Sequence, residues 1–342
     1  MPSGAGVPHI LRRTPEVRRR ARRRKSLRKY GLVLLCLSPW IVGFIVFAAV
    51  PMALSLYWSF THYDMLSSPH WVGLDNYKYM LGLGHLKING IKVAAASHHD
   101  PFFWATVRNT LWIIVVGVPL RVLFALVTAM VLTRPKRGVN LYRTFFFMPY
   151  MAPIVGATLV FVYLLNPTTG PVNIILTKIG LHPPLWFYDP TWSKPALVML
   201  GLWGIGDAIV IYMAGLLNVP RELYEAIAIE GANAWQRFKN VTLPLVTPVI
   251  FFTLVMGIIA GFQYFDQAYI AGNTASGQNS ELGSPQNSLL FYGLWLYQQA
   301  FRFFHMGYAA ALAWVLFAAT MAATVALLLT SRRWVYYGGG ER

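Results

Sequence analysis

The chain has few charged side chains, a single cysteine and no nucleotide-binding motif, and each of these shortages excludes a class of function or structure. Only 12% of its 342 residues are charged, against 56% hydrophobic residues and a mean hydropathy of +0.48. Soluble domains carry about 25% charged residues, so this composition indicates a membrane protein with several spans. The single Cys36 excludes an internal disulfide, and we expect it to serve only in packing.

Two further absences argue against an enzyme. No GxxxxGK[ST] sequence occurs, so any ATP hydrolysis must come from a separate chain. No nucleophile is paired with a base in a recognisable pattern, which leaves no catalytic residues to propose. We therefore expect no enzyme activity and no cofactor bound by this chain.

Acidic residues are scarce, and the formal net charge is +17. Much of the excess lies before residue 30, where Arg18 to Lys25 read RRRARRRK. A basic end beside an apolar span is explained by membrane topology and attraction to anionic lipids, so we expect no nucleic-acid partner. Residues 1–29 have too little apolar content to fold alone and are predicted to be a basic cytoplasmic tail.

Long apolar runs predict an all-α integral membrane protein with one transmembrane domain, residues 30–331. Positive loops are retained inside the cell, and loop 133–143 has four basic residues and no acid. This bias places both termini in the cytoplasm, with 332–342 as the C-terminal tail. The six predicted spans are 32–58, 103–132, 144–165, 195–217, 247–271 and 306–329.

The polar segment 61–101 is predicted to lie outside and contains His98-His99-Asp100. These side chains could form a metal cluster. No third ligand at zinc-like spacing accompanies the histidines, however, so a solvated outer loop is the favoured interpretation and we expect no metal site.

Residues 220–244, PRELYEAIAIEGANAWQRFKNVTLP, are too charged to cross the membrane. Good helix formers run to Glu230, Gly231 can end that helix in a left-handed conformation, and Asn233 can cap a second helix. We expect the second helix to end at Leu243-Pro244. Small side chains would let another protein approach the backbone closely. On spacing alone, an ordinary linker explains the segment as well as a docking site does.

Polar and aromatic residues inside spans are the candidates for a solute path, because each is costly in lipid. Asp207 either pairs with Arg121 or faces substrate. Gln263 and Asp266, one helical turn apart, line the path or make an interhelical polar contact. The full candidate set is Asp207, Trp203, Gln263, Tyr264, Asp266, Asn109 and Trp314, with packing favoured over substrate stacking for both tryptophans.

The charged segment resembles the EAA loop of ATP-binding-cassette (ABC) importer permeases. The residues that carry this resemblance are Glu225, Ala226, Gly231, Ala232, Leu243 and Pro244. The resemblance implies a coupling helix that enters a cleft on a cytoplasmic ATPase, with Glu225 as its polar anchor. Ile227 replaces the second alanine of the motif, a minor departure.

Other positions resemble carbohydrate-uptake permeases of the maltose and glycerol-phosphate importer group, with a MalF/MetI-like core. They are Ser38-Pro39, Gly73 to Tyr77, Met148-Pro149, Phe265-Asp266 and Gly307-Tyr308-Ala309. The Gly-Gly-Pro turn usual after span 5 reads Gly283-Ser284-Pro285 here, after extra polar residues 273–282. That departure leaves the docking of a binding protein open.

The resemblance implies a sugar permease that works by alternating access in a bacterial cell membrane. Its expected partners are a second permease in a heterodimer, two ATPase subunits that bind ATP and Mg, and an extracytoplasmic solute-binding protein. One alternative is an ABC permease for another polar solute, such as a polyamine, an amino acid or a phosphate ester. Another is an ion-coupled transporter using Asp207 and Asp266. Such transporters often have paired broken helices, which the sequence does not indicate.

Overall fold

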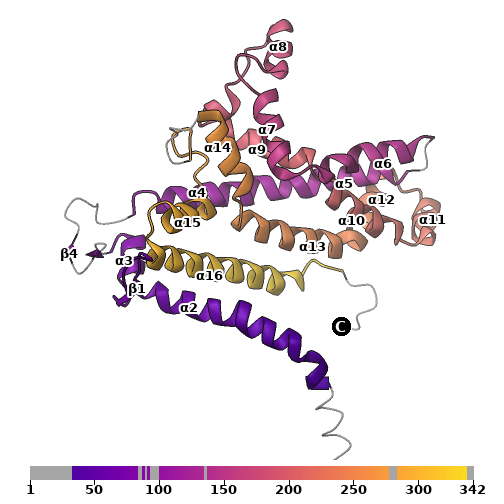
Figure 1. Ribbon diagram of the computed structural model, residues 1–342. Helices are drawn as coiled ribbons and strands as arrows, with labels where there is room; N and C mark the ends of the chain where they lie inside the picture. The colour runs from indigo at the N-terminus through magenta and orange to yellow at the C-terminus, as the bar shows by residue number, and fades with distance from the viewer. Residues whose placement is uncertain are drawn as a thin grey trace, which may run out of the picture. The chain divides into compact units, whose positions relative to one another are not determined.

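The computed structural model describes residues 33–83, 87–88, 91–92, 100–134, 137–276 and 283–336, and these are largely helical (Figure 1). Four of the helices are long and apolar enough to cross a membrane. Two bent helix pairs would raise the number to six if each pair is one span. The four long helices are Val33–Ser59, Phe103–Leu132, Ala234–Phe262 and Met306–Ser331.

The chain divides into two compact units, Met1–Tyr57 and Trp58–Arg342. The described part of the first unit belongs to the helix Val33–Ser59, which contains a π-helical turn at Ile45–Ala49 and ends as α2 (Val50–Ser59). Cys36 is exposed on this helix, contrary to the expected packing role. The predicted basic tail 1–29 lies outside the described residues.

The second unit begins with short elements: β1 (Thr61–His62), β2 (His70–Trp71), α3 (Asp75–Leu81), β3 (Lys87–Ile88) and β4 (Ile91–Lys92). Strands β1 and β2 pair antiparallel, as do β3 and β4. The helices that follow are α4 (Phe103–Trp112), α5 (Val118–Leu132), α6 (Val139–Phe147), α7 (Ile154–Leu164), α8 (Pro171–Lys178), α9 (Ser193–Trp203), α10 (Gly206–Leu217), α11 (Arg221–Ile229), α12 (Ala234–Arg237), α13 (Leu243–Phe262), α14 (Asp266–Ser276), α15 (Tyr292–Phe301) and α16 (Met306–Ser331).

The second predicted span has the bounds of α4 through α5, joined by a π-helical turn at Ile113–Gly117. The third and fourth spans are broken, which the sequence did not indicate. Helix α6 with its 3₁₀ extension and α7 meet at 100°, and α9 and α10 meet at 51°. The first break follows from Pro153, which forces the preceding Ala152 into an extended conformation that no helix continues through.

The predicted fifth span, 247–271, is wrong at both ends. A continuous helix already begins at Ala234 and stops at Phe262, and α14 is a separate helix. The predicted stop at Pro244 fails because Pro244 lies in the first turn of α13, directly after a π-helical turn at Phe238–Thr242. The wider turn accommodates a proline ring that would clash inside a regular helix.

Helices α5, α10 and α13 pack against one another and bury an apolar cluster that includes Ala125, Ala129 and Tyr212 (Figure 1). Close approach depends on glycine. A Cβ on Gly257 or Gly261 of α13 would lie within 2.8 Å of Val118 or 2.7 Å of Ile114 respectively. This GxxxG spacing is typical of tightly packed membrane helices.

A second cluster joins α7, α9 and α14 around Leu197 and Phe187, and a third joins α3, α4, α15 and α16 around Leu290 and Leu312. Residues at the start of α7 and near the ends of α9 and α13 line one pocket, which is described next.

Candidate functional site

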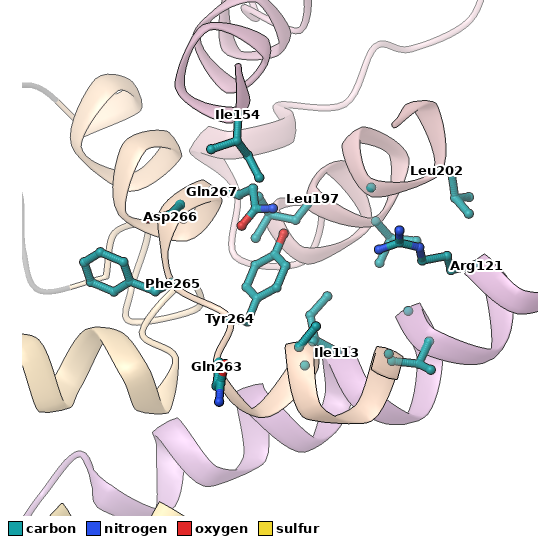
Figure 2. Close-up of a pocket in the computed structure, with 17 residues that line it drawn as sticks. Ile113, Arg121, Ile154, Leu197, Leu202, Gln263, Tyr264, Phe265, Asp266 and Gln267 are labelled. Carbon is teal, nitrogen blue, oxygen red and sulfur yellow. The ribbon is translucent and has the colours of Figure 1, made fainter. Parts of the chain in front are cut away.

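A pocket of about 200 Å³ lies where the interrupted helices meet (Figure 2). Its polar side chains are few: Arg121 from α5, Gln263 and Tyr264 from the break between α13 and α14, and Asp266 and Gln267 from the first turn of α14. The rest of the lining is apolar or glycine, contributed by Ile113, Gly117, Val118, Ile154, Leu197, Val198, Gly201, Leu202, Gly257, Ala260, Gly261 and Phe265. Apolar walls with a few convergent polar groups are typical of sites for small molecules.

Backbone irregularity surrounds this pocket. The π-helical turn at Ile113–Gly117 contributes both of its end residues, and Ile154 is the first residue after the 100° break. Gly201 and Leu202 precede the break before α10. In membrane proteins irregular backbone is tolerated where it is buried in protein or lines a water-filled cavity. The irregular backbone around this pocket is therefore consistent with a cavity that holds water or a solute.

Gln263, Tyr264 and Phe265 connect α13 to α14 without helical structure. The prediction that Gln263 and Asp266 share one helical face is thus wrong, although both line the pocket. Figure 2 shows the Tyr264 ring pointing into the space between Leu197 and Gln267, while Phe265 points away from it. The helix ends at Phe262, so the directions of these side chains do not follow the helical repeat.

Asp207 pairs with Arg121, one of the two alternatives left open by the sequence. The Arg121 Nη2 lies 2.8 Å from each carboxylate oxygen of Asp207. Asp207 lies in the first turn of α10, where the positive end of the helix dipole also favours a carboxylate. Arg121 lines the pocket and Asp207 does not, so the carboxylate acts on the pocket through the guanidinium it holds.

The remaining sequence candidates lie outside the pocket lining. Asn109 is buried and donates both amide hydrogens, to the carbonyl oxygens of Asn287 and Leu290 at 2.9 Å. Trp203 packs on Phe161 with ring centroids 5.5 Å apart, and Trp314 packs on Phe317. For both tryptophans the observed contacts are those of packing.

Sequence reasoning missed Gln267 and the pocket-facing role of Arg121. Gln267 follows the predicted candidate Asp266 directly and lies in the first turn of α14. The four-residue spacing of Gly257 and Gly261 was a readable signal of a close helix contact beside the pocket.

The position of Asp100 also differs from the sequence prediction. It was placed in a solvated loop, yet it is 1% exposed. One carboxylate oxygen accepts from the backbone N–H groups of Phe102 and Phe103, and the other accepts from Trp295 Nε1 at 2.6 Å and the Tyr308 hydroxyl at 2.5 Å. Burial, with a smaller contribution from Asp100, raises the pKa of Tyr79 to about 12. Asp100 is a cap and cross-link between α4, α15 and α16. His98 and His99 lie outside the described residues.

The segment after α10 folds as predicted up to its end. Gly231 has φ +79° and closes α11, and Asn233 exchanges capping hydrogen bonds with Gln236 at 2.8 and 2.9 Å. Glu225, Ala226 and Gly231 are exposed, whereas Ala232, Leu243 and Pro244 are half-buried. Large apolar side chains are exposed nearby, with Ile229 at 89% and Trp235 at 67%. Exposed apolar groups beside charged ones are typical of an interaction surface.

Two curated relatives are similar over much of the chain. The probable ABC transporter permease protein YesP of Bacillus subtilis is 37% identical over 321 residues, covering 93% of this chain and 96% of the relative. The lactose transport system permease protein LacF of Rhizobium radiobacter is 35% identical over 236 residues, covering 68% and 76%.

Among solved structures, a chain of a bacterial alginate ABC transporter, crystallised with an alginate pentasaccharide-bound periplasmic protein, matches with a TM-score of 0.74. The match covers 90% of this chain and 96% of that one, at 19% sequence identity, and it shows a shared fold.

The model of one family matches residues 121–337, which hold most of the pocket and the whole segment from α10 to α13. With this match and the relative at 37% identity, the chain belongs to the binding-protein-dependent transport system inner membrane components, the permease subunits of ABC transporters.

Proposed function

We propose that this chain is the permease subunit of an ABC importer for a sugar, and that the pocket in Figure 2 is its half of the translocation path. The observation that carries the proposal is the family match over residues 121–337, which hold most of a pocket lined by Arg121 and Tyr264 where three helix breaks and a π-helical turn meet. Broken helices also occur in ion-coupled transporters, and the family match decides between the two classes. A solute leaving water needs replacement hydrogen bonds, and broken helices are where membrane proteins supply them.

The size of the pocket supports a second permease subunit. At about 200 Å³ it is smaller than the 300–1,000 Å³ typical of ligand sites, so this chain alone encloses less space than such a site usually has. A related partner chain facing it would complete the cavity. We propose a heterodimer, as the resemblance to carbohydrate-uptake permeases implies.

The coupling segment Arg221–Arg237 is proposed to dock on a cytosolic ATPase. Exposed Glu225 offers a carboxylate, Gly231 offers bare backbone, and Ile229 offers apolar area. One coupling segment per permease implies two ATPase subunits for a permease pair. These subunits would bind ATP and Mg and perform the hydrolysis, with this chain binding neither.

A sugar suits the lining better than a charged solute does. Arg121 is neutralised by Asp207, and the other polar lining groups are two amides, a phenol and the Asp266 carboxylate, all of which hydrogen-bond to hydroxyl groups. Apolar and aromatic walls suit the C–H faces of a sugar ring. The lactose permease relative supports this substrate class.

With both termini and the coupling segment in the cytoplasm, the loops between α7 and α9 and between α14 and α16 face outward, where a solute-binding protein delivers the sugar. The protein would reside in a bacterial plasma membrane. Six spans follow if each bent pair is one span, as their combined length and composition allow.

The test is uptake of labelled mono- and oligosaccharides by cells that express the complete importer with wild type, Glu225→Ala or Glu230→Ala, with membrane levels measured for each. Glu230→Ala is the matched control, because it removes a carboxylate from another side of the same segment. We expect Glu225→Ala to reduce uptake at least tenfold and Glu230→Ala to have a small effect.

The active sugar would name the substrate. Normal uptake by Glu225→Ala at wild-type membrane levels would overturn the coupling role of the segment. Uptake of amino acids or polyamines but of no sugar would overturn the substrate class while leaving the permease assignment in place.

A further inference from the structure

A second, larger cavity lies at the other end of α5 and α10, beside the coupling segment Arg221–Arg237, and the proposed function assigns it no ligand. Its volume is about 530 Å³. Three arginines from separate elements line it: Arg134 after α5, Arg221 in α11 and Arg237 in α12. The other lining residues are Met130, Thr133, Leu216, Leu217, Val219, Tyr224, Ala234, Phe238 and Thr242. We propose that this cavity binds the headgroup of an anionic phospholipid.

The charge of the lining has one sign. No aspartate or glutamate is among the described residues that line the cavity. Within the described part of the chain, Arg134 and Arg221 form no ion pair, although Glu222 and Glu225 lie on the same helix as Arg221. Arg237 donates its Nε to the Ala232 carbonyl at 3.0 Å, which orients the guanidinium and leaves its terminal nitrogens available. Three like charges around one cavity favour an anion.

The hydroxyl groups of the lining already have hydrogen-bond partners within the protein. Tyr224 and Thr242 are hydrogen-bonded to each other at 2.9 Å, and the Thr133 hydroxyl donates to the Met130 carbonyl. The three guanidinium groups are therefore the main free donors in the cavity. Planar guanidinium donors match the oxygens of a phosphate.

The apolar part of the lining favours a lipid over a free anion. Met130, Leu216, Leu217 and Phe238 lie beside the arginines, and Leu217 is 65% exposed. A soluble phosphate has no apolar atoms to place against this surface, whereas the glycerol and upper acyl carbons of a phospholipid would cover it. Basic pockets between membrane helices on the cytoplasmic side are known to suit acidic lipid headgroups.

The position of the cavity fits this occupant. Helices α5 and α10 both end there, at Leu132 and Leu217, and the charged segment begins there. A helix that spans the bilayer ends near the headgroups. This placement on the cytoplasmic side rests on the proposed function, which puts the coupling segment in the cytoplasm.

The test is lipid retention by the purified importer complex in native mass spectrometry, with phosphatidylglycerol and phosphatidylcholine titrated in turn. The variants are Arg134→Gln and Arg134→Gln combined with Arg221→Gln. Arg137→Gln and Lys239→Gln are matched controls, because both residues are exposed, basic and close by in the chain but do not line the cavity.

We expect wild type to retain phosphatidylglycerol in preference to phosphatidylcholine. Arg134→Gln should bind phosphatidylglycerol about fivefold more weakly, the double variant more weakly still, and the controls like wild type. An excess of inorganic phosphate should not displace the lipid.

Equal retention of the two lipids, or equal loss in the control variants, would overturn the proposal. Displacement of the bound lipid by inorganic phosphate would overturn it in favour of a soluble anion. Sugar uptake measured on the same variants separates the lipid site from the proposed sugar transport. Wild type that takes up sugar without selective lipid retention would overturn the lipid site alone. Selective lipid retention without sugar uptake would overturn the proposed transport alone.

Discussion

The pair between Arg121 and Asp207 predicts a measurable coupling free energy. At the observed separation of 2.8 Å, Coulomb attraction is about 6 kcal/mol for an effective dielectric constant of about 20. The side chains are 38% and 32% exposed, so water screens the pair and part of the attraction is offset by lost hydration. We expect a net coupling of about 2 kcal/mol, between values typical of surface pairs and of buried ones.

A double-mutant cycle measures this coupling. The variants are Arg121→Gln, Asp207→Asn and the two combined, and the quantity is the free energy of unfolding by denaturant in lipid bicelles. Each single substitution leaves one charge without its partner, so the two single losses of unfolding free energy should add up to more than the loss in the double variant. The double variant should recover about 2 kcal/mol relative to the sum of the singles.

A coupling within about 0.5 kcal/mol of zero would refute the reasoning, because sites without interaction add within that margin. Sugar transport gives the second readout. If Asp207→Asn raises the KM for sugar tenfold without changing stability, the carboxylate faces substrate in another state of the transporter. If stability falls and Arg121→Gln has the larger effect on KM, Asp207 serves to position Arg121.

Three further substitutions test other parts of the structure by their effect on unfolding. Gly261→Ala should destabilise by about 1–3 kcal/mol, because its Cβ would lie 2.7 Å from Ile114 Cγ1, with the helix propensity of alanine offsetting part of the cost. Asp100→Ala should cost at least about 3 kcal/mol, because four donors, two of them on buried side chains, lose their acceptor. Burial, and then the neighbouring His62, lowers the pKa of His305 below 6.5, with Asp64 opposing. The unfolded chain then binds the proton more readily, so stability should fall as the pH drops below about 6.5, and His305→Gln should flatten that fall.

Each of these has a control in the same chain. Gly156→Ala adds a Cβ with no atom within 4 Å and should not destabilise the protein. Asp64→Ala removes a carboxylate held by an adjacent loop and should cost much less than Asp100→Ala. His70→Gln removes an exposed histidine and should leave the acid sensitivity intact. An equal effect in any variant and its control would contradict the contact invoked for it.

Much of the helical organisation was predictable, because apolar runs of sufficient length identify membrane helices whatever their packing. The bounds of Phe103–Leu132 were predicted to the residue, and Gly231 ends α11 in the left-handed conformation expected of it. Both features depend on local chemistry alone. The basic N-terminal tail and most of loop 273–282 lie outside the described residues, and those predictions stay predictions.

The breaks in the third and fourth spans were not predictable from hydropathy, because each bent pair is apolar enough to count as one span. Pro149 and Pro153 were visible in the sequence, but proline also occurs in unbroken membrane helices, as Pro248 does in α13. The interruption at Gln263–Phe265 has no proline or glycine within it. Asp100 was misplaced because two of its four donors are side chains 195 and 208 positions away, which no local pattern reveals.

The geometry also suggests how a change at the coupling segment reaches the pocket. Helix α10 enters the segment and the helix Ala234–Phe262 leaves it, and each has its far end at a break beside the pocket. The two helices cannot slide freely, because the Gly215 position approaches Val249 so closely that a Cβ there would lie 2.7 Å from its side chain. Helices packed this tightly move together. Displacement of the coupling segment by an ATPase would thus shift Arg121's partner Asp207 and the Tyr264 break in one motion, changing the polar groups presented to the solute.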